Sequence, residues 1–281
     1  MNRMLQRTGI VLVFSLVSLQ AFSSGWPTGK KKWVLIPTWY QYLASSYRDP
    51  FSKALFYPSQ GLYSSALLKM YWEYGLTNKL DLVGSIPYYL IRYKDQQVNQ
   101  HQEGFADMEL GLRYNLVNVD NRSFLSIQAT GEVPAYHNDS LRVPFIGFAD
   151  PGAEARLMYS GNRKAGVKDW YFNAEAAFRE YFDQHGGISQ ASLLASAGLY
   201  LDRSNLVSAD LSGTRSYSNS SAFNPLNLNG NTNFFFLKAT LTYGHRISPV
   251  LWAYGGVFHD LYGRNTGIGK GFTLMLIYRS K

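Results

Sequence analysis

The sequence contains no cysteine and, beyond its first two dozen residues, no long uncharged apolar run. Without cysteine, the chain can form neither a disulfide framework nor a thiolate metal site. Without a stretch of about 20 apolar residues, no later segment meets the length of a membrane-spanning helix. Glycine-rich phosphate loops and zinc-ligand spacings are also missing, so we expect no cofactor and no metal. Charged residues make up only 16% of the chain, and the mean hydropathy is −0.19.

What the sequence has instead is aromatic residues, 21 Tyr, 17 Phe and 6 Trp, with tyrosine recurring at intervals. Leu110 and Leu112 lead to Tyr114, while Glu109 and Arg113 occupy the alternate positions. An apolar stripe that ends in an amphipathic ring is typical of a lipid-facing strand at the membrane boundary. Six such runs, spaced by about forty residues as expected for one hairpin of long strands, end on Tyr74, Tyr114, Tyr159, Tyr200, Tyr243 and Tyr278. The pattern predicts an all-β fold, a closed antiparallel transmembrane β-barrel.

A period of two divides the chain into about twelve strands of roughly ten residues. The predicted strands are 32–44, 62–74, 80–93, 105–115, 123–134, 150–159, 168–182, 188–201, 206–215, 234–243, 250–259 and 271–278. Short turns alternate with longer connections, and the longer ones around 45–61, 135–149 and 216–233 are expected to face the outside. In the eighth strand the apolar parity leaves Tyr200 out of phase, which a bulge or a shifted boundary would explain. The aromatic girdle is therefore assigned to Tyr74, Tyr114, Tyr159, Tyr243 and Tyr278.

The first residues have the layout of a secretory signal peptide. Arg3 and Arg7 precede the apolar run 10–19, and small residues follow it. This run is too short to anchor the chain as a helix. We expect residues 1–23 to be the signal peptide and residues 24–281 to form one outer-membrane β-barrel domain. Its expected partners are outer-membrane lipid and lipopolysaccharide, the barrel-assembly machinery of a Gram-negative-type bacterium and a small solute, and not nucleic acid.

The inward-facing charged residues are the candidates for chemistry. The predicted lumen-lining or selectivity residues are Lys69, Glu73, Asp107, Glu109, Arg113, Glu154, Arg156, Glu175, Arg179, Asp210 and Lys238. Glu109, Glu154 and Glu175 each precede an arginine by two or four positions, so strand pairing can stack them into a belt of alternating charge. One interpretation is a salt-bridge lattice that fills a narrow, non-conducting barrel. The other is a charged constriction that selects small polar or anionic solutes.

Catalysis is not predicted. His137-Asn138-Asp139-Ser140 brings a base, a carboxylate and a hydroxyl together, but catalytic triads are usually assembled from distant positions. His259-Asp260 is equally unspecific. A surface hydrolase is therefore the least favoured alternative, and no catalytic residue is assigned.

Two segments carry a family resemblance. Residues 73–80, with Ile86-Pro87-Tyr88, and residues 104–114 resemble recurrent elements of small outer-membrane barrels. Both are similar to the family described as a MetA-pathway phenol-degradation or outer-membrane transporter group. The resemblance implies a barrel and the passage of aromatic or hydrophobic compounds. Together with the lumen pattern, it leads us to expect a channel or transporter for small solutes, aromatic or anionic.

Overall fold

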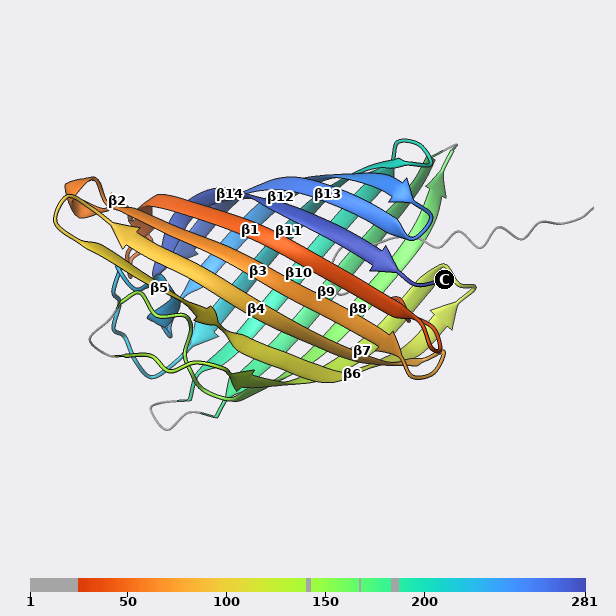
Figure 1. The fold of residues 1–281 in the computed structure, drawn as a ribbon, viewed down its shortest axis with the longest axis horizontal. Helices are drawn as coiled ribbons and strands as arrows, with labels where there is room; N and C mark the ends of the chain where they lie inside the picture. Colours follow the sequence, from red (N-terminus) through yellow and green to blue (C-terminus); the bar gives the residue numbers. More distant parts are fainter. Residues whose placement is uncertain (1–24, 140–142, 167, 183–186) are drawn as a thin grey trace, which may run out of the picture.

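The structure is a computed structural model that describes residues 25–139, 143–166, 168–182 and 187–281. The expected signal peptide lies outside these residues. The described chain forms a closed antiparallel β-barrel (Figure 1). Pairing of the last strand with the first closes the sheet, with Val34 opposite Arg279 and Tyr42 opposite Gly271. None of the helices in this part of the chain has the length and apolarity needed to cross a membrane.

Twelve strands form the barrel wall, which confirms the predicted fold and strand count. They are β1 (Trp33–Arg48), β3 (Leu62–Gly75), β4 (Leu80–Lys94), β6 (Asp107–Val119), β7 (Ser123–Pro134), β8 (Gly152–Ala165), β9 (Lys168–Tyr181), β10 (Ser189–Tyr200), β11 (Asn205–Tyr217), β12 (Phe235–Ser248), β13 (Leu251–Arg264) and β14 (Thr266–Arg279). Two further strands, β2 (Ala54–Phe56) and β5 (Asn99–Phe105), pair with β1 and β4. Two short 3-10 turns, Pro58–Gln60 and Leu228–Gly230, lie in the connections.

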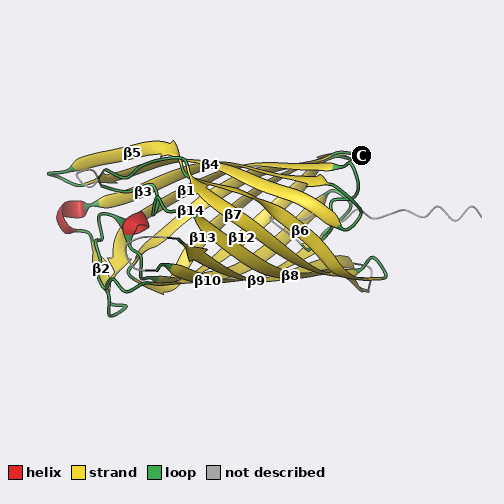
Figure 2. Ribbon diagram, turned by 90° about the horizontal axis from the view of Figure 1, so that it is seen from below, coloured by secondary structure: helices red, strands yellow, loops and turns green. Residues whose placement is uncertain are grey.

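The barrel has a short-turn end and a long-loop end, as Figure 2 shows from the side. The short-turn end holds the start of β1, the end of β14 and brief connections such as those at 76–79, 120–122 and 201–204. The long-loop end carries the connections at 49–61, 135–151 and 218–234. The last connection, between β13 and β14, departs from this pattern because it consists of Asn265 alone, at a φ of 53°.

Side chains alternate between lipid and lumen along each strand because successive residues of a strand point to opposite faces. In β3, Leu68 and Met70 are exposed on the outside, whereas Glu73 is buried inside. Tyr200 follows the same rule and faces the lumen. The pairing of β10 with β9 and β11 is regular throughout, so neither a bulge nor a shifted boundary is needed to explain its phase.

Several predicted boundaries are wrong because the strands continue past the inferred membrane zone. The segments 160–167 and 244–249, left between the predicted strands, lie largely within β8 and β12. The predicted polar loop 94–104 contains β5, whose register against β4 differs from that of β6 by one residue. The prediction placed strand ends at residues that favour turns. In the structure these residues stay in the strands, because hydrogen bonding to the neighbouring strand outweighs their local preference.

Candidate functional site

A chain segment enters the lumen at the short-turn end, before β1 begins. Gly25 N donates to the Ser160 hydroxyl at 2.8 Å, and the Ser126 hydroxyl donates to Gly25 O at 2.6 Å. Trp26 is 7% exposed and packs on Phe124, with ring centroids 6.1 Å apart. This N-terminal segment, residues 25–32, therefore crosses the mouth from β1 towards β7 and β8.

An inner ion cluster, defined by Glu73, Asp81 and Arg113, holds this segment in place. Arg113 Nη2 lies 2.7 Å from Glu73 Oε2 and 2.8 Å from Asp81 Oδ2, and the Arg113 side chain is 1% exposed. Thr28 joins the cluster, since its hydroxyl donates to Glu73 at 2.6 Å and accepts from Arg113 at 3.1 Å. Three strands and the N-terminal segment thus meet at one dry guanidinium.

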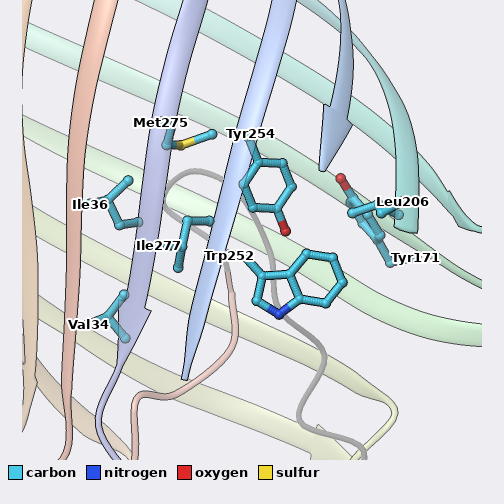
Figure 3. Close-up of a cluster of buried hydrophobic side chains, with 8 residues drawn as sticks. All are labelled: Val34, Ile36, Tyr171, Leu206, Trp252, Tyr254, Met275 and Ile277. Carbon is cyan, nitrogen blue, oxygen red and sulfur yellow. The ribbon is translucent and has the colours of Figure 1, made fainter. Parts of the chain in front are cut away.

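A cluster of buried apolar side chains lies on the inner face of the wall at the same end of the barrel (Figure 3). Tyr200 and Tyr71 pack against it, and Tyr200 meets Trp252 edge to face at 6.4 Å. Its buried members come from both edges of the barrel closure and from β9, β11 and β13: Val34, Ile36, Tyr171, Leu206, Trp252, Tyr254, Met275 and Ile277. The short-turn end is therefore packed like a protein interior.

Further along the axis, β6 to β9 carry a charged belt. Arg156 lies 2.7 Å from Glu154 and 2.6 Å from Glu175. Arg179 lies 2.7 Å from Glu154 and 3.2 Å from Glu109. The alternating belt that the spacing suggested exists as a continuous chain of ion pairs.

The structure also corrects the membership of the belt. Glu132 on β7, which the sequence reading missed, lies 2.6 Å from Arg179 Nη2. Arg113, which the spacing grouped with Glu109 in the belt, belongs instead to the inner ion cluster together with Glu73 and the overlooked Asp81. Glu132 and Asp81 have the inward parity of their strands, and that signal could have identified them.

The remaining predicted lumen residues also face inward, but none of them lies within 3.5 Å of a belt residue in an ion pair. Lys69 reaches its edge, 3.9 Å from Glu109. Asp107 bonds to the Tyr136 hydroxyl in the long loop, and Asp210 bonds to Ser196. Lys238 lies away from the belt on β12, 4.0 Å from Asp260.

The wall next to the belt, on β10 to β12, carries many small hydroxyl side chains, such as the Ser192 and Thr214 pair at 3.0 Å. A cavity of about 250 Å³ lies between this hydroxyl wall and the belt. Arg156 and Glu175 border it on one side, and Ser192, Thr214 and Phe236 border it on the other. The two belt arginines are partly accessible, with 23% of the Arg156 side chain and 20% of the Arg179 side chain exposed.

Carboxylates outnumber cations among the buried and half-buried strand residues that face inward. The seven cations are Lys69, Arg113, Arg156, Arg179, Lys238, Arg246 and Arg279, and the ten carboxylates are Glu73, Asp81, Asp107, Glu109, Glu132, Glu154, Asp169, Glu175, Asp210 and Asp260. A low-dielectric wall with an excess of one charge attracts ions of the opposite sign. This balance favours cations and does not favour the anionic solutes that the sequence suggested.

Loops meet across the long-loop end. Phe145 N donates to Asn227 Oδ1 at 2.7 Å, and Asn229 Nδ2 donates to Ile146 O at 3.2 Å. The Tyr63 hydroxyl ties Asn229 to β3 at 3.2 Å. These contacts join the loop 135–151 to the loop 218–234 over the lumen.

The five girdle tyrosines point outward towards the short-turn end. Tyr114, Tyr159, Tyr243 and Tyr278 are exposed, and Tyr74 packs on Trp33 at 4.5 Å. The sequence reading missed a second outward aromatic group towards the long-loop end: Tyr88, Phe105, Phe178, Tyr217 and Tyr262. Tyr88, the partner of Phe105, and Leu80, the partner of Tyr114, are eight positions apart on β4, which corresponds to about 26 Å along the strand and about 20 Å across a bilayer at a tilt of about 40°. The two groups therefore bracket a band of membrane thickness.

The structure separates the His259-Asp260 pair noted in the sequence. His259 and Asp260 are consecutive in β13, so their side chains lie on opposite faces of the wall. His245 contacts Asn205 at the rim, 2.9 Å away. The hydroxyl of the 137–140 run belongs to Ser140, which lies outside the described residues. Among the residues that the structure describes, no group of metal-ligating side chains is placed so that it could hold an ion.

The fold is similar to that of known outer-membrane barrels. An outer membrane channel from Pseudomonas putida F1 superposes with a TM-score of 0.64 at 13% identity, covering 92% of this chain and 99% of that one. The NanC porin (TM-score 0.49, 6% identity, 88% and 100% coverage) is more distant. The translocator domain of the autotransporter NalP from Neisseria meningitidis is equally distant, with a TM-score of 0.49 at 11% identity, covering 89% of this chain and 88% of that one.

No protein-family model matches the sequence, and no curated protein is significantly similar to it. The first of these structural matches gives the chain the fold of a bacterial outer-membrane β-barrel. It is consistent with the outer-membrane family that residues 73–80 and 104–114 resemble.

Proposed function

We propose that the protein is a channel of the bacterial outer membrane through which small solutes diffuse. The observation that carries this proposal is the cavity of about 250 Å³ between the charged belt and the hydroxyl wall. A belt that served only to fill the barrel would have its cations buried, as Arg113 is, whereas Arg156 and Arg179 are partly accessible. The structural neighbour from Pseudomonas putida, described as an outer membrane channel, supports this interpretation.

The N-terminal segment supplies a means of closing the channel. It lies across the short-turn mouth and is held through hydrogen bonds of Gly25 and Thr28, rather than through strand pairing along its length. Its withdrawal would leave the barrel wall intact, because the sheet closes through β1 and β14. The alternative is a permanently sealed, non-conducting barrel, and the packing of the same mouth is the observation in its favour.

Planar-bilayer recordings of the purified protein separate these two functions. We expect discrete conductance steps from the wild type and larger or more frequent steps after deletion of residues 25–30. Heat-modifiable migration on a gel checks that both proteins have folded as barrels. If both folded proteins are electrically silent and loss of the gene leaves solute uptake unchanged, the channel proposal fails.

A further inference from the structure

The lumen wall near β1, β12 and β13 holds a lysine inside a box of aromatic rings. The Lys238 ammonium lies 5.0 Å from the ring centre of Phe258, 5.1 Å from Tyr40, 5.3 Å from Phe236 and 5.9 Å from Tyr42. It also donates a hydrogen bond to the Tyr40 hydroxyl at 2.5 Å, so it lies at the hydroxyl end of that ring. Tyr40 and Phe258 are stacked, with centroids 4.3 Å apart and planes 5° from parallel. We call these four rings the aromatic box.

A fixed carboxylate stands behind the aromatic box. Asp260 Oδ1 lies 4.0 Å from the Lys238 ammonium. Its other oxygen accepts hydrogen bonds from the Tyr42 hydroxyl at 2.9 Å and from Gly269 N at 3.0 Å. Because Asp260 is buried and held by two donors, it keeps its position whether or not the lysine stays beside it.

The aromatic box opens towards the lumen. The Lys238 side chain is 20% exposed, and Phe236, one of the four rings, also lines the cavity of about 250 Å³. The Phe236 ring therefore lies between a molecule in that cavity and the Lys238 ammonium. Long lysine side chains change rotamer readily, so the ammonium can leave without any movement of the backbone.

Ring faces and a carboxylate together select a cation. The negative face of an aromatic ring attracts ammonium groups, and aromatic cages recognise alkylated amines in this way. An anion would meet both the ring faces and Asp260 and would be repelled. The excess of inward carboxylates raises the local concentration of cations along the same path.

We propose that the aromatic box with Asp260 is a binding site for a small organic cation of the alkylammonium class, and that Lys238 is its tethered occupant when no such ligand is present. The resident Lys238 shows that a primary ammonium fits among these groups. Binding competes with Lys238, so the lysine lowers the affinity of the site and keeps Asp260 paired in its absence. The proposal rests on the proposed channel function only for the route by which the cation reaches the lumen.

Calorimetric titration of the folded barrel in detergent with tetramethylammonium tests the site without any conductance measurement. We expect Lys238→Met to bind at least tenfold more tightly than the wild type, because Asp260 and four rings are left without their cation. In the Lys238→Met background, Phe258→Leu should weaken binding by roughly tenfold, and Asp260→Asn should weaken it more. The neutral tert-butanol, which has a similar shape, should not bind.

Gel migration and the circular-dichroism spectrum of each variant establish that it is folded, and Lys238→Gln replaces Lys238→Met if the latter does not fold. If the folded lysine variant binds tetramethylammonium no more tightly than the wild type, or binds tert-butanol equally well, the aromatic box is only a packing arrangement for Lys238. Bilayer recordings form a separate arm of the test. A silent barrel that nevertheless binds the cation would contradict the channel proposal while leaving the site intact.

Discussion

The two halves of the lumen use ion pairs in different ways. At the short-turn end, Arg113 is 1% exposed and shares two carboxylates with the N-terminal segment beside an apolar cluster. In the belt, Arg156 also contacts two carboxylates, yet 23% of its side chain is exposed beside a cavity. The same pairing chemistry therefore closes one end of the lumen and lines an open space further along. Burial decides which role the guanidinium has, because separating a buried charge from its partners costs much more free energy than separating an exposed one.

The largest expected effect is on stability at Arg113. Arg113→Ala leaves Glu73 and Asp81 buried without their cation, which should lower the free energy of unfolding by about 3–5 kcal/mol. Urea titration in detergent, followed by gel migration, measures the loss. Arg156→Ala is the matched control and should cost clearly less, because the Arg156 side chain is 23% exposed beside a cavity and water can take the place of its guanidinium next to Glu154 and Glu175.

A triple variant sharpens this comparison. Arg113→Ala combined with Glu73→Gln and Asp81→Asn removes the unpaired charges and should recover part of the lost stability. Equal losses for the Arg113 and Arg156 variants would show that the two halves do not differ as proposed.

The next effect concerns the N-terminal segment. Trp26→Ala removes a buried ring that packs on Phe124, at a cost to docking of about 3–5 kcal/mol. We expect the segment to undock more often, so bilayer recordings should show more frequent conductance steps. Urea stability should change much less than in Arg113→Ala, since the barrel hydrogen bonds remain. A large loss of stability without any change in conductance would make the segment part of the barrel wall rather than a closure.

The smallest effect is on selectivity at the belt. Arg156→Ala removes one positive charge beside the cavity and should shift the permeability ratio towards cations by roughly twofold. The reversal potential in a potassium chloride gradient measures this ratio. Arg163→Ala, at the exposed short-turn rim, serves as the control, because salt screens a solvated charge. A shift in favour of anions at Arg156 would contradict the position of the belt in the conducting path.

Some parts of the site were predictable from single strands. The inward position of Glu109, Glu154 and Arg179 follows from alternation, because the period of two is a local property of an extended chain. The pair of Glu154 with Arg179 joins adjacent strands, whereas the pair of Glu109 with Arg179 reaches from β6 to β9 and was not predictable from strand pairing. Tyr200 shows the limit of this reasoning, since its phase was attributed to a bulge or a shifted boundary, whereas the side chain faces the lumen in a regular strand and contacts Trp252.

The sequence by itself determined the barrel, its twelve strands, the outward tyrosines and the side of the wall on which each charge lies. These depend on alternation and on the apolar requirement of lipid, both of which are written along each strand. Only the tertiary structure decided that Arg113 holds Thr28, or that Lys238 lies among rings from β1 and β13. Tyr40 and Lys238 are 198 positions apart, and their contact depends on strand tilt, register and closure. Closure is a property of the whole sheet, so no segment of the sequence carries it alone.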